Sequence, residues 1–316
     1  MGNNVKPVVE GGLLVAISVV LGLAATYLPI VGLAVEFFCA VPFVILTVKQ
    51  GANKALTALI VSFFLLAMFM GPLLAARLAF TINICGVILG WCITQNFDAV
   101  KSFLATFVSS IAAQVTAIAF VLLVMGINFT ETEISMLKES FEQSFEFYES
   151  VGVDQAQLNE MKSQVAPMLE LMSFLMPTIV VLVSLVNTVA CYLTAKWIFQ
   201  KLRFKFVEPL PPFKEWRFPK VFLYIAAFAI LGMYWGATRQ WGLVQIISVN
   251  ATFLAMGVGL IQGLAVFSFA ADRYNVSKFL RRLIFLLIIL NMMFTQIAAF
   301  VGLFDMIFDY RKKLFR

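Results

Sequence analysis

The alternation of apolar and polar positions divides most of the chain into long apolar runs separated by short polar turns. A run of 18 or more apolar residues is typical of a transmembrane helix. Inside lipid the backbone must satisfy its own hydrogen bonds, and these runs are too long for the alternating strands of a barrel. We expect an all-α, polytopic helical membrane protein with eight or nine transmembrane helices, the first retained rather than cleaved as a signal peptide. The predicted spans are about 8–27, 30–48, 53–70, 73–95, 99–126, 167–198, 219–236, 241–271 and 283–308.

The segment 127–166 departs from this pattern because it is acidic and amphipathic. It holds eight of the 17 acidic residues of the chain. Thr130 and Glu133 have the spacing of a capping box, and Asp154 can cap a second helix. We expect an amphipathic helical insertion on the outer ends of the spans; a lid over an outward-facing pocket and a docking surface are the alternatives. Its predicted apolar stripe recurs at steps of three and four: Ile134, Leu137, Phe141, Phe145 and Tyr148.

Basic residues set the expected orientation, because Lys and Arg are enriched in cytoplasmic loops. With the N-terminus in the cytoplasm, the lysines of the early turns, the basic loop 196–220 and the basic segment 273–282 all lie inside. Nine complete spans would instead place Arg311, Lys312 and Lys313 outside. We therefore expect that the last run is re-entrant or that one span is miscounted.

Composition narrows the function classes. The chain is 62% hydrophobic and 13% charged, whereas soluble domains carry about 25% charged residues. Histidine is absent and no P-loop motif occurs, which excludes His-ligated zinc, Ser–His or Cys–His nucleophiles and P-loop ATP hydrolysis. The four cysteines lie in apolar runs without CxxC pairing, as expected of buried hydrophobes. We expect no enzyme activity, cofactor or metal site, and no binding of nucleic acid.

Glu36 and Arg77 are opposite charges at similar predicted depth. Each lies about five or six residues inside its span, or roughly 7–9 Å below the outer interface. A charged side chain in hydrocarbon costs roughly 2.5–3.5 kcal/mol on insertion scales, so an inward-facing pair is one way to lower that cost. Snorkelling of each side chain to the outer headgroups is the alternative. Pro42, six residues deeper than Glu36, is expected to kink the second span.

Other polar and small residues in the spans allow weaker predictions. The amides of Asn83, Gln114, Asn187 and Asn250 can be ligand contacts, although hydrogen bonding between helices is the commoner role of such residues. Asp305 and Asp309 could hold a cation, but neutralisation of a helix end by Arg311, Lys312 and Lys313 is the favoured interpretation. Close helix packing is predicted by the GxxxG spacing of Gly86 with Gly90, Gly232 with Gly236 and Gly259 with Gly263.

The order of motifs in the first 200 residues resembles the S components of energy-coupling factor vitamin transporters. Leu28-Pro29, Glu36 to Pro42, Lys49-Gln-Gly51, Gly71-Pro72 and the Gly86–Gly90 helix follow one another as in those proteins. The whole chain resembles the YybS-like family of uncharacterised bacterial membrane proteins, through the tail Gly302 to Arg311 and the run beginning at Gln262-Gly263. The resemblance implies a six-helix domain at 1–200, a further region at 201–316 and location in the bacterial cytoplasmic (inner) membrane. S components dock on a partner through small residues of helix 1, which here correspond to Gly12 and Ala16.

We therefore expect a protein that binds or transports a small solute from the outer face without its own ATPase. The candidate ligand-binding residues are Glu36, Arg77, Asn83, Gln114 and Asn187, and the candidate packing or docking residues are Gly12, Ala16, Gly86, Gly90, Gly259 and Gly263. The expected partners are the lipid bilayer, the solute, and a coupling subunit with an ATPase or another membrane protein. The alternative is a membrane scaffold or regulatory partner with no transport activity.

Overall fold

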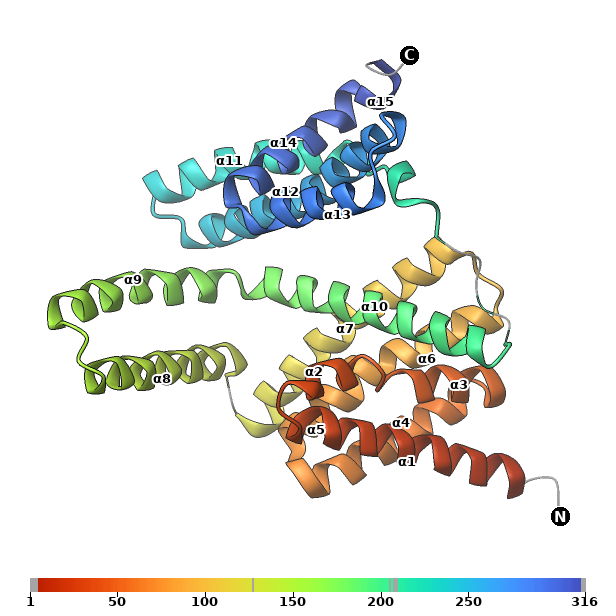
Figure 1. The fold of residues 1–316 in the computed structure, drawn as a ribbon. Coiled ribbons are helices and arrows are strands. Elements are labelled where there is room, and N and C mark those ends of the chain that lie inside the picture. The colour runs from red at the N-terminus through yellow and green to blue at the C-terminus, as the bar shows by residue number, and fades with distance from the viewer. Residues whose placement is uncertain (1–4, 127, 205, 207–209, 314–316) are drawn as a thin grey trace. The chain divides into compact units, whose positions relative to one another are not determined.

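The computed structural model describes residues 5–126, 128–204, 206 and 210–313, which form helices joined by short turns (Figure 1). No strand occurs in these ranges, so the predicted all-α polytopic fold is confirmed. Within the same ranges, eight helical segments are long and apolar enough to span a bilayer: Lys6–Tyr27, Val31–Gln50, Ala52–Met70, Pro72–Thr94, Ala99–Leu123, Met176–Lys201, Val221–Thr238 and Gly242–Arg273.

The chain divides into two compact units. Unit 1 comprises Met1–Leu158 with Ile179–Leu210, and unit 2 comprises Asn159–Thr178 with Pro211–Arg316. The predicted division into an S-component-like region 1–200 and an added region 201–316 stays a prediction.

Unit 1 is built from long uninterrupted helices and two interrupted spans. In it α1 (Val5–Tyr27) packs against α3 (Val41–Gln50) and α4 (Ala52–Met70), α3 packs against α6 (Asn83–Thr94), and α6 packs against α7 (Ala99–Met125) (Figure 1). A Cβ on Gly86 would collide with the Ala40 carbonyl, and one on Gly90 would lie 2.8 Å from the Val44 carbonyl. The Gly86–Gly90 spacing therefore serves the contact between α6 and α3 within one chain.

The second and fourth spans are both irregular near one end. The second consists of α2 (Val31–Glu36) and α3, with a turn over residues 37–40 between them. Pro42 lies in the first turn of α3, where a missing N–H costs no hydrogen bond. The predicted kink at Pro42 is thus wrong in position, because the break comes before it. The fourth span consists of α5 (Pro72–Ala76), a π-helix η1 (Arg77–Ile82) and α6.

The sixth span begins later than the sequence pattern indicates. The predicted run 167–198 is divided at Leu175 between α9 (Gln155–Phe174) and α10 (Met176–Lys201). In unit 2 the Asn250 side chain bridges this break: its Nδ2 donates to the Phe174 carbonyl at 2.7 Å, and its Oδ1 accepts from the Thr178 N–H at 2.9 Å. Asn250 thus replaces hydrogen bonds that a continuous helix would have made.

The acidic insertion is helical on both sides of residues 151–154. α8 (Phe129–Ser150) is capped by Asn128, whose Oδ1 accepts from the Glu131 N–H at 3.5 Å, so the predicted capping box at Thr130 and Glu133 is wrong by two residues. Asp154 accepts from the Ala156 N–H at 3.2 Å and caps α9 as predicted.

Unit 2 contains two close helix contacts. α11 (Val221–Thr238) meets α12 (Gly242–Arg273) where Gly236 faces Gln245, and α12 meets α14 (Met292–Phe308) where Gly259 and Gly263 face the backbone of Ala298, Ala299 and Gly302. The short helices η2 (Phe213–Glu215) and α15 (Tyr310–Lys313) complete the described part of this unit.

The last apolar run is not one straight span. α13 (Lys278–Leu290) and α14 are separated at Asn291 and bent by 103°. Near the start of the run, Arg281 pairs with Asp272, and Lys214 pairs with the same carboxylate at 3.0 Å. Just after its end, Arg311 Nη1 donates to the Lys214 carbonyl at 2.6 Å. Both ends of the run therefore lie near Lys214, the geometry of a hairpin, and the described ranges hold eight complete candidate spans, or nine if the bent pair α13–α14 counts as one.

Candidate functional site

Glu36 and Arg77 form the ion pair that their predicted depths suggested. Arg77 Nη2 lies 3.0 Å from Glu36 Oε1. Glu36 is the last residue of α2, and Arg77 is the first residue of the π-helix η1. The Glu36 side chain is 18% exposed and that of Arg77 is 62% exposed, so the carboxylate is held inside while most of the guanidinium side chain is uncovered. The pair therefore joins the irregular parts of two spans.

Hydroxyl groups from other helices stabilise the break after Glu36. Thr194 Oγ1 on α10 lies 3.0 Å from the Phe37 carbonyl and 2.6 Å from the Ala190 carbonyl of its own helix, and its one proton is shared between them. Ser18 Oγ on α1 donates to the Cys39 carbonyl at 3.2 Å. Non-helical backbone at membrane depth is tolerated only where protein or water satisfies its polar groups. These two hydroxyls do so here for the carbonyls of Phe37 and Cys39.

The π-helix after Arg77 has its own side-chain hydrogen bonds. The Thr81 hydroxyl donates to the Arg77 carbonyl, and Cys85 Sγ donates to the Thr81 carbonyl at 3.3 Å. Single π turns inside α-helices are uncommon and are frequent at functional sites. A wider turn also changes the angular position of every later residue, which sets how Ile82 and Asn83 face their neighbours.

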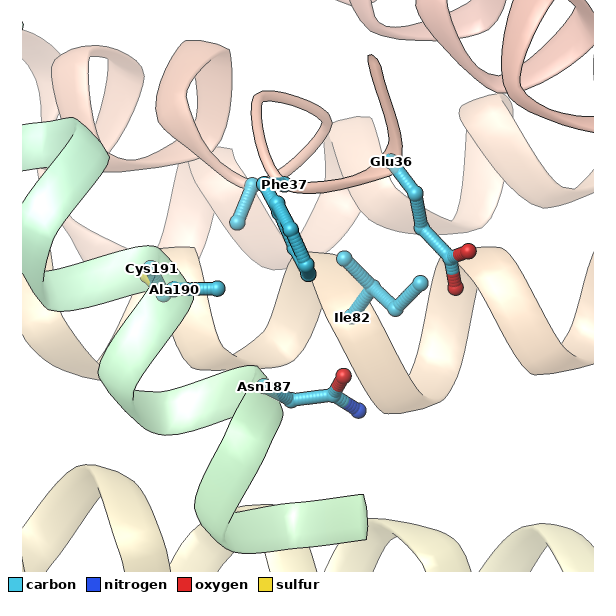
Figure 2. A pocket seen from close by; sticks show the side chains of 7 residues that line it. Glu36, Phe37, Ile82, Asn187, Ala190 and Cys191 are labelled. Atoms are coloured by element: carbon cyan, nitrogen blue, oxygen red, sulfur yellow. The ribbon is translucent and has the colours of Figure 1, made fainter. Parts of the chain in front are cut away.

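A small cavity lies beside Glu36. Its volume is about 10 Å³, which is room for roughly one water molecule. Figure 2 shows the Asn187 amide extending from α10 toward the side of the cavity where Ile82 and Glu36 lie. The Asn187 side chain makes no hydrogen bond with any residue that the structure describes. The lining residues are Glu36, Phe37, Ala40, Ile82, Asn187, Ala190 and Cys191.

The other two predicted ligand contacts lie elsewhere. Gln114 Nε2 donates to Ser184 Oγ at 2.7 Å and so joins α7 to α10. Asn83 is buried, and its Oδ1 accepts no hydrogen bond from the part of the chain that the structure describes. Neither residue lines the cavity. The structure thus places Glu36 and Asn187 at one cavity, pairs Arg77 with Glu36, and leaves Gln114 and Asn83 elsewhere.

The predicted docking residues of helix 1 lie on the exposed face of α1 in unit 1. Gly12 and Ala16 are exposed, and a Cβ on Gly12 would meet no atom within 4 Å. Gly86, Gly90, Gly259 and Gly263, by contrast, are occupied by contacts within the chain.

Asp305 and Asp309 are neutralised by basic groups and amides, the interpretation that the sequence favoured. Asp305 is buried, accepts from Gln262 Nε2 at 2.6 Å and pairs with Arg311 at 3.4 Å. Asp309 pairs with Arg217 at 2.9 Å and Lys312 at 3.2 Å; the Lys313 side chain lies outside the described residues. Partial burial opposes ionisation of Asp309, but hydrogen bonds from Lys312 and Arg217 outweigh it and lower the pKa of this carboxyl. No group of three or more His, Cys, Asp or Glu in the described ranges could hold a metal ion.

Several residues of the site have no signal in the sequence. Phe37, Ile82, Ala190 and Cys191 are ordinary apolar positions of their spans, and their place at the cavity follows from helix packing. Ser18 and Thr194 are the exception, since hydroxyls inside apolar spans are frequent partners of freed carbonyls.

The comparisons with known proteins agree with this fold. A family described as "Predicted membrane protein (DUF2232)" matches residues 16–306. The "Uncharacterized protein YybS" of Bacillus subtilis (strain 168) is 22% identical over 326 residues, covering 99% of both chains. No solved structure matches the chain. The family match spans most of the sequence, including the site, α13 and most of α14, and the chain therefore belongs to the DUF2232 family of predicted membrane proteins.

Proposed function

We propose that this protein is a non-enzymatic membrane protein of the bacterial cytoplasmic membrane that binds or transports a small polar solute from the outer face. The observation that carries the proposal is the Glu36–Arg77 pair, which joins a broken helix to a π-helix beside a cavity. The amide of Asn187, which has no partner among the described residues, lines the same cavity. Ionisable residues inside spans are expensive and are usually kept for ligand pathways. A break and a π turn also give the two spans places where they can bend.

A cavity of about 10 Å³ admits water but no metabolite, so binding requires the site to open. The groups already at the cavity offer a carboxylate, an amide with unused donors and acceptors, and the ring of Phe37. A solute that binds Glu36 and Asn187 would compete with Arg77 for the carboxylate. We therefore expect ligand binding to weaken the ion pair and to change the backbone conformation at residues 37–40.

Transport would need energy from elsewhere, because the chain has no P-loop of its own. The S-component-like order of motifs favours a coupling subunit and an ATPase as partners. Gly12 and Ala16 offer an open, small-residue surface on α1 for such a partner. Replacing Gly12 with Leu should leave the thermal stability unchanged and reduce co-purification of the partner.

The test is a thermal-unfolding screen of the purified protein against vitamins, amino acids and related small solutes. A ligand that binds only the folded state raises the unfolding temperature. We expect a solute that stabilises the wild type but not Glu36→Gln or Arg77→Gln. Glu10→Gln is the matched control, since it breaks another intramolecular ion pair, with Lys49, at the start of α1. A stabilising solute whose effect survives both site substitutions would contradict this site.

A scaffold or regulatory role is the second candidate, favoured by the surface of α8. This helix exposes Met136, Phe147 and Tyr148 alongside several glutamates, an uncommon combination for a helix with no further role. A scaffold should co-purify a stoichiometric protein partner that is lost on replacing Phe147 and Tyr148 with Ser. It should show no ligand-dependent stabilisation in the same screen.

A further inference from the structure

The basic side chains of unit 2 fall into two classes. Five of them, Lys220, Arg239, Arg273, Lys278 and Arg282, form no ion pair with any described residue, and three of these five are close together in sequence: Arg273, Lys278 and Arg282. Arg273, Lys278 and Arg282 lie in the segment 272–282, whose one acidic residue is Asp272. The oxygens of Asp272 are taken by Lys214 and Arg281. The paired class comprises Lys214 and Arg281 with Asp272, Arg217 and Lys312 with Asp309, and Arg311 with Asp305.

The helix that carries two of these cations has an unusual distribution of charge. In α13 the basic residues Lys278, Arg281 and Arg282 all lie among the first five residues, and the eight residues 283–290 are all apolar. Lys278 and Arg282 are one turn apart and share a face. No residue of α13 is buried, and Phe279 is 79% exposed. The helix therefore has a basic N-terminal turn followed by a long exposed apolar surface.

The length and direction of α13 fit a helix that enters the membrane without crossing it. Thirteen residues extend about 20 Å, short of the roughly 30 Å hydrocarbon core. The 103° bend at Asn291 then turns the chain into α14. With its apolar part in lipid, the first turn of α13 lies at the level of the headgroups, where phosphates are the available anions.

We propose that Arg273, Lys278 and Arg282 bind the phosphate of an anionic phospholipid headgroup, with the acyl chains lying along the exposed apolar surface of α13. Guanidinium groups make paired hydrogen bonds to phosphate oxygens, and the ammonium group adds a third positive charge. Clusters of Lys and Arg beside a membrane helix attract anionic lipids through the same chemistry. The site lies in unit 2 and is independent of the solute site in unit 1.

The experiment compares lipid binding by the full-length protein and two matched triple variants. Protein purified in neutral detergent is mixed with phosphatidylglycerol or phosphatidylcholine of identical acyl chains, and bound lipid is counted by native mass spectrometry. The test variant is Arg273→Gln, Lys278→Gln and Arg282→Gln. The control variant is Lys54→Gln, Lys196→Gln and Lys201→Gln, which removes three cations of unit 1 that also form no ion pair with a described residue.

We expect the wild type and the control to prefer phosphatidylglycerol, and the test variant to lose that preference by roughly tenfold. Raising the salt concentration should weaken the wild-type preference, because charge attraction is screened. The charge-conserving variant Arg273→Lys with Arg282→Lys should keep most of the preference, which separates loss of charge from loss of folding. An unchanged preference in the test variant, or an equal loss in the control, would overturn the proposal. So would loss of a co-purified protein in place of lipid.

Discussion

Two charged side chains at one end of unit 1 show how much a single contact depends on its surroundings. Glu36 is mostly covered, whereas the side chain of Arg77 is 62% exposed. An ion pair with one exposed partner gains little in water, about 0.2–1 kcal/mol. Its importance at this position comes from the alternative, which is an unpaired carboxylate next to a small apolar cavity.

The first prediction concerns this pair. In a double-mutant cycle with Glu36→Gln and Arg77→Gln, we expect a coupling of about 0.5–1 kcal/mol, because each partner loses the same contact. Thermal unfolding of the four proteins in detergent measures it. Strictly additive effects would contradict the pair.

The second prediction concerns the hydroxyl of Thr194. Thr194→Val keeps the shape of the side chain but removes the proton that the Phe37 and Ala190 carbonyls share, and we expect a loss of about 1–2 kcal/mol. Thr116→Val is the control, since that exposed hydroxyl donates only to Ala112 within its own helix, and its effect should stay within about 0.5 kcal/mol. Equal losses in the two variants would argue against stabilisation of the break.

At the scale of helices, unit 2 depends on a contact that has no room for side chains. A Cβ on Gly302 would overlap the Gly259 carbonyl and lie 2.5 Å from the Gly263 nitrogen. Backbone atoms cannot move aside as a flexible side chain can, so α12 and α14 would have to separate.

The third prediction follows from this contact. Gly302→Ala should destabilise unit 2 by roughly 1–3 kcal/mol or more through overpacking. Gly257→Ala on α12 has open space, and it should be neutral or should stabilise by up to about 1 kcal/mol because Ala favours helix. Unfolding of each variant, followed by circular dichroism, distinguishes the two outcomes. Comparable effects at both positions would be inconsistent with the close contact.

The fourth prediction concerns the pH dependence of the C-terminal end of α14. The pKa of Asp309 is lowered, so its contribution to stability is complete above the unfolded-state pKa and disappears as the pH falls through the lower folded-state pKa. Asp309→Asn should remove that loss between about pH 5 and pH 2. Asn also tolerates the left-handed backbone at this position, where φ is 46°. A pH profile of unfolding unchanged by the substitution would count against the ion pair with Arg217.

At the scale of the whole molecule, the bend between α13 and α14 bears on which side of the membrane Arg311 and Lys312 lie. Arg311 donates to the carbonyls of Lys214 and Trp216, which precede α11. The segment that starts α11 and the segment that ends α14 therefore share one side of the membrane. That arrangement places Arg311 and Lys312 on the same side as Lys214, Arg217 and Lys220, as the distribution of Lys and Arg in membrane proteins favours.

The fifth prediction tests this arrangement by labelling. Single cysteines at Lys220 and Lys312 should react with a membrane-impermeant maleimide from the same side, and one at Arg239, in the turn between α11 and α12, from the other side. The four native cysteines are buried and should contribute little background. Reaction of Lys312→Cys together with Arg239→Cys would show that the last run crosses the membrane.

The sequence by itself determined the class of fold, because hydrophobic length is a local property and lipid leaves helices as the solution for such runs. It also indicated the Glu36–Arg77 pair, since depth in a span follows from counting residues, and the Asp154 cap, since capping depends on adjacent backbone.

Only the tertiary structure decided where the helices are interrupted and what the interruptions do. The break at residues 37–40 depends on hydroxyls of α1 and α10, and the break at Leu175 depends on Asn250 of α12. The return of the last run depends on Lys214, Asp272 and Arg311, which are far apart in sequence. Hydropathy cannot locate such breaks because a broken helix and a straight one have the same apolar composition, and their difference lies in which distant group satisfies the freed backbone.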